Sequence, residues 1–526
     1  MSPTENRLKL EKQFTMLLKT YEQWQRTLQL SADTYLSTYD DSMRLLDMVK
    51  QCYRFIHKIQ ANYGLEQGLR DDSINYYQTR DSKTFTELKS WILEHIAADI
   101  TPSHLTGNEW DFQPHQNSFI GMSIIANCDL KKNDLVLQIP RQIMLSAKYV
   151  PGRRKELIPL LDCLSDTPIL ELIACLLYHR LLGVKSCFRV YLDSLPSVYN
   201  IPVYWDIDTL KCLIGTQLFF RVITNLRASM CLYWQLVHLC DHFSSELPLL
   251  NRVSVTWELF RWALGAVSTR QNCIPMNSQS DVALTLIPGW DMINHEHGNI
   301  TTRFDMESQR LVHYALRAFN HGDEITMCYG NCSNELRLLH SGFAVHDNPD
   351  DALDIDVDIP RDELWKIREL LLVNNGVRVS KRGDVKLSIR TSDAGMITMQ
   401  AVVISMAKFS TKSELSACMR FLNPAATLEG FLITRDLSHE LKIRIVKGIE
   451  SILSTFNEQH EKVIHKLETL VSQHGPAETC DKTQTSNFHG FLITLQGQTC
   501  LVKTCLAMIQ ESFTKSNVNH RCITMW

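Results

Sequence analysis

The sequence predicts an α+β protein in which two β-rich segments flank a long helical block. Short β-rich runs separated by turn residues occur at 117–146 and again at 282–330. The residues between them, 151–265, are apolar at helical spacing, as are most of residues 1–95 and 344–475. We therefore expect one β domain interrupted by a helical insertion, with further helices before and after it.

The changes of pattern give the predicted boundaries. We expect an N-terminal helical region at 1–95 and a β domain at 96–343, with its helical insertion at about 151–256. A helical C-terminal domain follows at 344–475. The polar, turn-rich stretch at 472–490 predicts that residues 476–526 are a linker and tail, with one more apolar element.

The β-rich segments divide into individual strands. SIIAN and DLVLQIP are separated by the turn residues KKND, and Pro140 should end the second strand or place it at a sheet edge. The later segment predicts strands in VALTLIPGW, ITTRFD, LVHYAL and DEITMCYG. These short runs are typical of small antiparallel sheets.

Composition excludes several classes of function. Hydrophobic residues make up 44% and charged residues 21%, and the net charge of −4 comes without a basic run, so we expect no nucleic-acid partner. The N-terminus has no apolar signal region, and ILELIACLLYHRLLGV (169–184) is expected to be a core helix, so no membrane contact is predicted. We expect a monomer in the cytoplasm, with the nucleus as a second location.

The stretch WDMINHEHGN (290–299) suggests a metal site at first, because Asp291, His295 and His297 lie close together in sequence. A metal site needs further ligands at fixed spacing, and the sixteen cysteines include no C-x-x-C pair. We therefore expect no metal, and we assign His297 to a turn with Gly298 and Asn299. Motifs for a nucleophile elbow, a P-loop, a zinc protease and a dinucleotide fold are also missing.

Three segments in order carry a family resemblance: STRQNCIP (268–275), PGWDMINHEHGN (288–299) and DEITMCYGNCSNELRLLHSGF (323–343). With the β-rich piece at 117–141, they resemble SET-domain methyltransferases of the branch typified by the plant Rubisco lysine methyltransferase. Within that branch they are most similar to the actin-histidine N-methyltransferases. The resemblance covers 70–475 and is strongest over 257–343. It implies a SET-domain β-fold with a helical inserted subdomain and a helical C-terminal substrate-binding domain.

The resemblance implies S-adenosylmethionine as the cofactor. Methyl transfer is an in-line displacement that needs aligned reactants rather than an enzyme nucleophile. Arg270 suits the cofactor's carboxylate, since a guanidinium can donate two parallel hydrogen bonds. Asn294 and His295 match the family's Asn-His motif. The other cofactor positions that the resemblance implies are Arg80, Gly121, Met122, Tyr329, Ser341 and Phe343.

One family motif is altered in this chain. The family's Glu-Gly-Phe-Gly cofactor turn is matched here by Ile120-Gly121-Met122-Ser123, so one glycine and one acidic group are lost. Cys332 stands where a basic peptide-binding residue is expected.

The resemblance also assigns catalysis and substrate binding. Tyr329 would place an oxygen dipole at the methyl-transfer channel, which favours a positive sulfonium. A substrate imidazole is already mostly neutral at cellular pH and needs orientation, which the Asn272 carboxamide can supply. The implied substrate-binding residues are Gln271, Asn272, Ile274, Trp290, Asp291 and Met327.

The expected activity is therefore N-methylation of a histidine of actin, with actin as the protein partner. Two alternatives stay open. One is a protein-lysine methyltransferase of the same fold. Its substrate would differ from histidine in needing to lose a proton before attack. The other is a non-catalytic SET-fold binding module, which the altered turn at 120–123 would suit.

Overall fold

The computed structural model describes residues 3–30, 39–61, 82–97, 110–114, 122–149, 152–278, 280–379, 385–391, 399–418, 431, 437–474 and 482–523. The chain divides into two compact units. The first unit comprises residues 1–16, 51–204 and 226–331, and the second comprises 17–50, 205–225 and 332–526. The boundaries of these units differ from the predicted domain boundaries. The helical insertion contributes residues to both units, and residues 332–343 belong to the second unit.

The first unit contains ten short strands, counted over the described residues, in three sheets with the orders β1-β2-β10-β7, β3-β9-β8 and β4-β6-β5. The strands before the helical insertion are β1 (Trp110–Pro114), β2 (Met122–Ala126), β3 (Leu135–Pro140) and β4 (Leu145–Ser146). Those after it are β5 (Asn272–Ser278), β6 (Asp281–Leu286), β7 (Asn294–His295), β8 (Thr302–Asp305), β9 (Arg310–Tyr314) and β10 (Glu324–Met327). The runs predicted as strands are confirmed.

Strands from the two sides of the helical insertion pair with each other in every one of these sheets. β2 pairs with β10, β3 with β9, and β4 with β6, all antiparallel. Pro140 ends β3, as predicted, opposite Arg310. One pair is parallel: β7 lies beside β10, with Asn294 opposite Thr326 and His295 opposite Met327. The predicted arrangement, one β domain with an inserted helical block, is confirmed.

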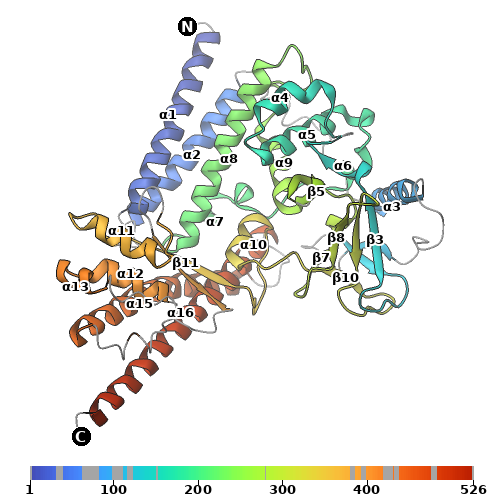
Figure 1. Ribbon diagram of the computed structural model, residues 1–526. Coiled ribbons are helices and arrows are strands. Elements are labelled where there is room, and N and C mark those ends of the chain that lie inside the picture. Colours follow the sequence, from blue (N-terminus) through green and yellow to red (C-terminus); the bar gives the residue numbers. More distant parts are fainter. Residues whose placement is uncertain are drawn as a thin grey trace. The chain divides into compact units, whose positions relative to one another are not determined.

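Helices of the first unit lie beside these sheets (Figure 1). They include α3 (Ser82–Ala97), α4 (Ile158–Cys163), α5 (Pro168–Leu182), α6 (Arg189–Ser194) and α9 (Trp257–Arg270), with short 3-10 turns η1 (Arg141–Ile143), η2 (Lys155–Leu157), η3 (Gly183–Lys185), η4 (Pro202–Tyr204) and η5 (Trp290–Met292). α5 is buried from Leu170 to His179, which confirms the core helix predicted there. The Thr256 side chain accepts a hydrogen bond from the Leu259 N–H and so caps α9, which ends where β5 begins.

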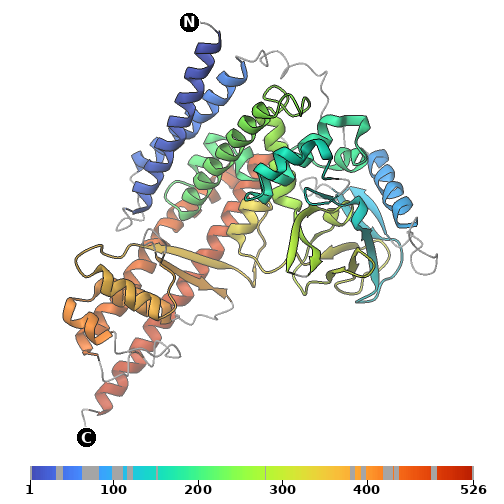
Figure 2. The ribbon, with the colours of Figure 1, turned by 45° about the horizontal axis from the view of Figure 1, so that its top comes forward.

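Three of the described helices contribute residues to both units: α1 (Pro3–Leu30), α2 (Tyr39–Ala61) and α8 (Gln217–His242). The rest of the second unit comprises α7 (Ile207–Lys211), α10 (Asn334–His340), β11 (Ala352–Val357), α11 (Trp365–Asn374), β12 (Val385–Arg390), α12 (Met399–Phe409), α13 (Lys412–Cys418), α15 (His439–His474) and α16 (Lys482–Ile523). Figures 1 and 2 show α15 and α16 running side by side. Their apolar faces join β11, β12, α11 and α12 in one core.

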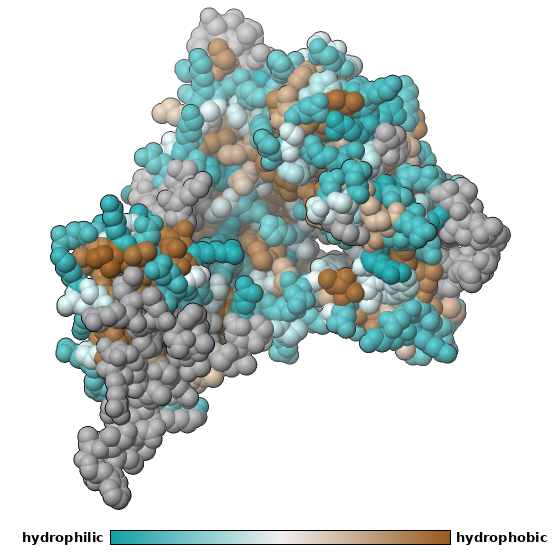
Figure 3. Space-filling view, in the orientation of Figure 1, coloured by the Kyte–Doolittle hydropathy of each residue, from teal (hydrophilic) through white to brown (hydrophobic). Residues whose placement is uncertain are grey.

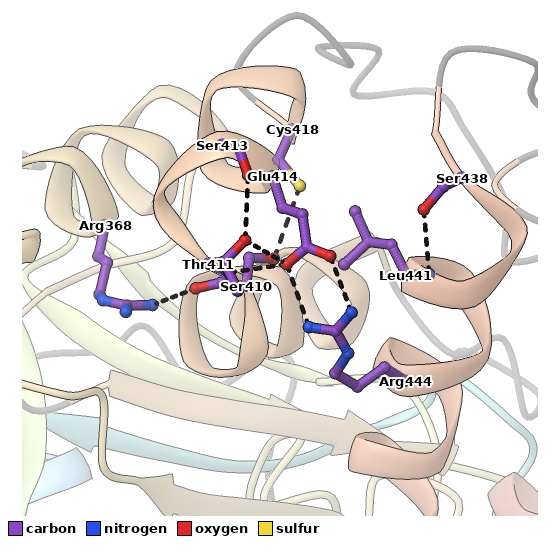
Figure 4. Close-up of polar contacts among 9 residues, drawn as sticks. All are labelled: Arg368, Ser410, Thr411, Ser413, Glu414, Cys418, Ser438, Leu441 and Arg444. Carbon is purple, nitrogen blue, oxygen red and sulfur yellow. Dashed lines mark hydrogen bonds and ion pairs between the residues drawn. The ribbon is translucent and has the colours of Figure 1, made fainter.

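An ion pair joins α13 to α15 in this core region (Figure 4). Arg444 donates to both oxygens of Glu414 at 2.8 and 3.1 Å. The same carboxylate accepts from the Thr411 N–H at 2.8 Å, so Glu414 also satisfies a backbone donor at the start of α13. α15 begins similarly, because the Ser438 hydroxyl accepts from the Leu441 N–H at 3.2 Å.

The segment predicted as a linker and tail contains a long helix. α16 includes the one described helical stretch, Asn487–Ser512, that is long and apolar enough to cross a membrane by length and composition. On its inner face Phe491, Val502 and Ile509 are buried, and the last two pack into the core of the second unit. A second apolar feature lies on α11, where Leu370 and Val373 are exposed and apolar side chains gather at the surface (Figure 3).

Candidate functional site

The three motif segments meet in the first unit through the strand pairing. Arg270 ends α9, Asn272 begins β5, and η5 leads directly into β7. β7 lies parallel to β10, and Tyr329 follows β10 by two residues. Gly330 then adopts φ +100°, a conformation that L side chains rarely take, so the chain turns sharply straight after Tyr329.

Arg270 and Asp291 form a buried ion pair. Nη1 of Arg270 donates to the backbone carbonyl of Asp291 at 2.6 Å and lies 3.7 Å from its Oδ1. The Asp291 side chain is only 1% exposed, and its Oδ2 accepts a hydrogen bond of 2.5 Å from the Tyr191 hydroxyl. This placement differs from the predicted one, which turned Asp291 toward the substrate: the carboxylate instead faces Arg270 and Tyr191.

The charge of Arg270 is fixed by these neighbours. Burial lowers the pKa of the guanidinium, but the Asp291 carboxylate, followed by Tyr199, Tyr191 and Tyr329, outweighs this effect and leaves the pKa above its usual value. Arg270 is therefore a cation at every physiological pH. A buried carboxylate that lost this partner would cost about 3–5 kcal/mol of stability.

One edge of the Arg270 guanidinium remains available. Nε is buried without a hydrogen-bond partner among the described residues, and Nη2 makes no hydrogen bond to any of them. The next residue shows the same feature, because the side-chain oxygen of Gln271 is buried and unpartnered within that part of the chain. An unsatisfied buried polar atom costs about 1–3 kcal/mol. Polar atoms left in this state at the junction of α9 and β5 fit a site that a ligand completes.

Asn294 presents an acceptor. Its Nδ2 donates to Glu324 Oε1 at 2.7 Å, which fixes the orientation of the amide. Nδ2 also lies 3.4 Å from the carbonyl of Met122, a predicted cofactor residue at the start of β2. The amide oxygen makes no hydrogen bond to a described residue, so it can accept from a ligand ammonium group.

His295 is held as a hydrogen-bond acceptor. Its Nδ1 accepts from the backbone N–H of Tyr329 at 3.2 Å, and the two rings lie 5.2 Å apart. The neutral ring therefore carries its proton on Nε2. The His297 ring lies 5.1 Å from that of His295 in an edge-on arrangement. Over the residues that the structure covers, no three His, Cys, Asp or Glu side chains are grouped to hold a metal ion.

Tyr329 is fixed at both ends of the residue. Its hydroxyl donates to the backbone carbonyl of Ile293 at 2.7 Å, so the proton points toward the chain that enters β7. The lone pairs of the phenolic oxygen then face away from that carbonyl. Tyr329 is 40% exposed, which leaves the ring accessible. A fixed oxygen with outward lone pairs is suited to stabilising a positive charge.

The Asn272 amide is oriented by its own backbone. Its Oδ1 accepts from the N–H of Cys273 at 2.8 Å, so the oxygen and nitrogen of the amide are not interchangeable. A carbonyl oxygen has two lone pairs, and one remains for a second donor. Asn272 can therefore accept an N–H from a substrate beside β5.

Trp290 is anchored from β8 and β9. Its indole N–H donates to the Thr302 hydroxyl at 3.1 Å, and that hydroxyl lies 2.9 Å from His313 Nδ1. Thr302 and His313 face each other in the register of β8 and β9. Burial lowers the pKa of His313 to about 4, so the ring is neutral. The chain of contacts holds η5, and with it Asp291, against the sheet.

The remaining predicted residues are divided between the units. Ile274 and Met327 are buried on β5 and β10 of the first unit. Ser341 and Phe343 belong to the second unit, where Ser341 follows α10 and the Arg337 guanidinium lies 6.0 Å above the Phe343 ring. Arg80 and Gly121 lie outside the described residues.

Sequence reasoning missed Tyr191, Glu324 and Thr302. Tyr191 lies in α6 of the helical insertion, 100 residues before Asp291, and carries no motif. Glu324 and Thr302 stand in strands that were predicted, and their side chains reach the site only through the pairing of β7 with β10 and of β8 with β9. The alternation of side chains along a strand could have indicated them only if the partner strands had been known.

The neutral state of His313 predicts a pH dependence of stability. Its pKa is 6.5 when unfolded and about 4 when folded, so its contribution is complete above pH 6.5 and is lost as the pH falls toward 4. Between pH 7 and pH 5 this loss is about 2 kcal/mol. The free energy of unfolding is measured by urea denaturation at pH 7 and at pH 5. Because glutamine cannot titrate, we expect the free energy of unfolding of His313→Gln to fall about 2 kcal/mol less between these pH values than that of the wild type. Equal losses would contradict this account. His460 in α15, whose pKa burial also lowers to about 4, is present in both proteins and cancels.

Comparison with known proteins agrees with this geometry. The SET domain family matches residues 121–330. The chain is 32% identical over 269 residues to the actin-histidine N-methyltransferases of Mus musculus and Homo sapiens, an alignment that covers 49% of this chain and 44% of each relative. The matched part thus spans less than half the length of these curated relatives.

Solved structures show the same fold over more of the chain. The crystal structure of the SET domain of LSMT bound to lysine and AdoHcy has a TM-score of 0.56 and 16% identity, and it covers 83% of this chain and 92% of that one. The structure of Rubisco LSMT bound to AdoMet has a TM-score of 0.55 and 16% identity, with 82% and 93% covered. The family match, the strands interleaved across a helical insertion, and the Asn-His segment on β7 beside the Tyr-Gly segment just after β10 together identify residues 121–330 as a SET domain.

Proposed function

We propose that this chain is an S-adenosylmethionine-dependent protein-histidine N-methyltransferase that methylates a histidine of actin. The relatives with 32% identity are actin-histidine N-methyltransferases, which supports the reaction and the substrate. The observation that carries the choice of histidine is the orientation of Asn272, whose amide oxygen is fixed by the Cys273 N–H. That oxygen is the group which an imidazole substrate needs.

The residues of the first unit fit the cofactor. The Nε and Nη2 edge of Arg270, which has no hydrogen-bond partner within the described ranges, would hold the cofactor's carboxylate with two parallel hydrogen bonds. The amide oxygen of Asn294 would accept from its ammonium group, because Nδ2 is already committed to Glu324. When bound, S-adenosylmethionine supplies an electrophilic methyl group on a positively charged sulfur.

Asn272 orients the nucleophile. A neutral imidazole has one N–H and one nitrogen with a free lone pair, and only the second can accept a methyl group. If Asn272 Oδ1 accepts the N–H, the opposite nitrogen is left bare and directed away from β5. No general base is required before attack, since an imidazole with a pKa near 6.5 is mostly neutral at pH 7 and above. The proton on the other nitrogen can leave to solvent after transfer.

Tyr329 stabilises the charge. Its hydroxyl donates to the carbonyl of Ile293, so the lone pairs of the phenolic oxygen face away from that carbonyl and toward a bound sulfonium. A dipole that is already fixed costs no reorganisation during the reaction, which is why such groups lower barriers more than water does. Tyr329 therefore acts by electrostatics and alignment.

Incubation with actin tests the proposal directly. Purified full-length chain, actin and methyl-labelled S-adenosylmethionine should give label on a histidine, located by mass spectrometry of the digested product. Label on lysine would establish the lysine alternative, and its rate would rise about tenfold per pH unit below a pKa near 10.4. Histidine methylation should instead be almost flat above pH 7. Cofactor binding without label on any protein residue would favour a binding module.

Substitution of Asn272 separates orientation from packing. We expect Asn272→Ala to lower kcat/KM for the protein substrate by about 10- to 100-fold, because a lost hydrogen bond to the reacting ring misaligns it. Asn272→Asp keeps an acceptor in the same place and should recover part of this loss. If both variants were equally impaired, the acceptor role would be wrong, and equal activity in all three proteins would remove Asn272 from the mechanism.

Substitution of Tyr329 tests the electrostatic role. Tyr329→Phe removes the oxygen but keeps the backbone N–H that His295 accepts, so the cofactor's Kd should change little. We expect kcat to fall about 100-fold, the usual effect of losing one stabilising dipole. The matched control is Tyr314→Phe on β9, which removes a hydroxyl that accepts from Arg303 at 3.1 Å. Unchanged kcat in Tyr329→Phe would refute the assignment.

A further inference from the structure

The helical insertion sends one side chain to the ion pair of the site. Tyr191 lies on α6, is fully buried, and donates its hydroxyl proton to Asp291 Oδ2 at 2.5 Å. The residue's own carbonyl accepts from the Ser194 hydroxyl at 2.7 Å, which ties down the end of α6. Nothing in the motif segments requires a tyrosine in the insertion.

The hydrogen bond from Tyr191 determines which oxygen of Asp291 faces Arg270. With Oδ2 held by Tyr191, Oδ1 lies 3.7 Å from Arg270 Nη1, too far for a hydrogen bond. The guanidinium is instead bonded through Nη1 to the Asp291 carbonyl at 2.6 Å. Without the bond from Tyr191, Oδ2 can turn toward Arg270 and accept from the edge that has no hydrogen-bond partner among the described residues.

The state of the tyrosine suits this task. Burial, and next the Asp291 carboxylate, raise the pKa of Tyr191 well above its usual value, although Arg270 opposes the shift. The phenol therefore keeps its proton and stays a donor at physiological pH.

We propose that Tyr191 is a positioning residue for cofactor binding: it restrains the Asp291 carboxylate, so that the Nε and Nη2 edge of Arg270 stays open to the cofactor's carboxylate. The inference rests on the proposed function and assigns part of the cofactor site to the helical insertion. Tyr191 itself touches Asp291 and acts on the cofactor only through Asp291 and Arg270.

Calorimetry of S-adenosylhomocysteine binding to the full-length chain tests this role without turnover. We expect Tyr191→Phe to weaken the Kd about 10-fold while the KM for the protein substrate and the kcat at saturating cofactor stay within about twofold. Tyr178→Phe is the matched control, since it also removes a hydroxyl of the helical insertion that donates to a carboxylate, Glu156 at 2.7 Å. Its Kd should equal that of the wild type.

A structural role would give a different pattern. If Tyr191→Phe lowered the melting temperature but bound S-adenosylhomocysteine as tightly as the wild type, the positioning role would be overturned. A double-mutant cycle with Asp291→Asn gives a second measurement: the two changes should be less than additive in Kd, because Tyr191→Phe acts through a carboxylate that Asp291→Asn has already removed. Additive effects would also overturn it. A wild-type chain that binds no S-adenosylhomocysteine would refute the proposed function, and this role with it.

Discussion

The antiparallel pairing of strands from the two sides of the helical insertion is the constraint on which the site depends. β2, β3 and β4 each need a partner that lies more than 130 residues later in the chain, and β10, β9 and β6 supply them. Because a strand's backbone groups must be paired when buried, these contacts fix the register of the later segments. The parallel addition of β7 to β10 then places His295 opposite Met327, two residues before Tyr329, so the Asn-His and Tyr-Gly segments meet. The insertion adds helices without disturbing this arrangement.

A buried ion pair stands where the helical insertion meets the sheets. Arg270 comes from the end of α9, Asp291 from η5, and Tyr191 from α6, so three separate segments depend on one carboxylate. Removing either charge would leave the other buried and uncompensated, whereas the pair itself adds little net stability. Such a cluster is better explained by the geometry that it maintains than by the energy that it contributes. The edge of Arg270 left without a described partner is the part of that geometry which a ligand can use.

The sequence alone was enough for the strands, the helical insertion and the order of the motif segments, because alternation, turn residues and helical spacing are local patterns. It could not indicate Tyr191, since α6 and η5 lie 100 residues apart in sequence and meet only in the tertiary structure. It also placed the Asp291 carboxylate on the substrate side, although charge pairing with Arg270 draws that group into the interior. The long helix α16 was expected as little more than a tail element. Its apolar face is buried because α15 offers a matching face, which is a property of two helices rather than of one.

The two histidines of HEHGN show why residue type alone is a poor guide to chemistry. The Nδ1 lone pair of His295 accepts a hydrogen bond from the Tyr329 backbone N–H, so this nitrogen is not available to a metal ion or a proton. The same argument, applied to a substrate histidine, requires the opposite arrangement: its N–H must be taken by an acceptor so that its lone pair stays free. Asn272 can provide that acceptor because the Cys273 N–H has already decided which end of the amide faces outward. Discrimination between histidine and lysine would then follow from a single fixed carbonyl dipole, since a lysine side chain has no ring to orient and must lose a proton before its nitrogen can attack.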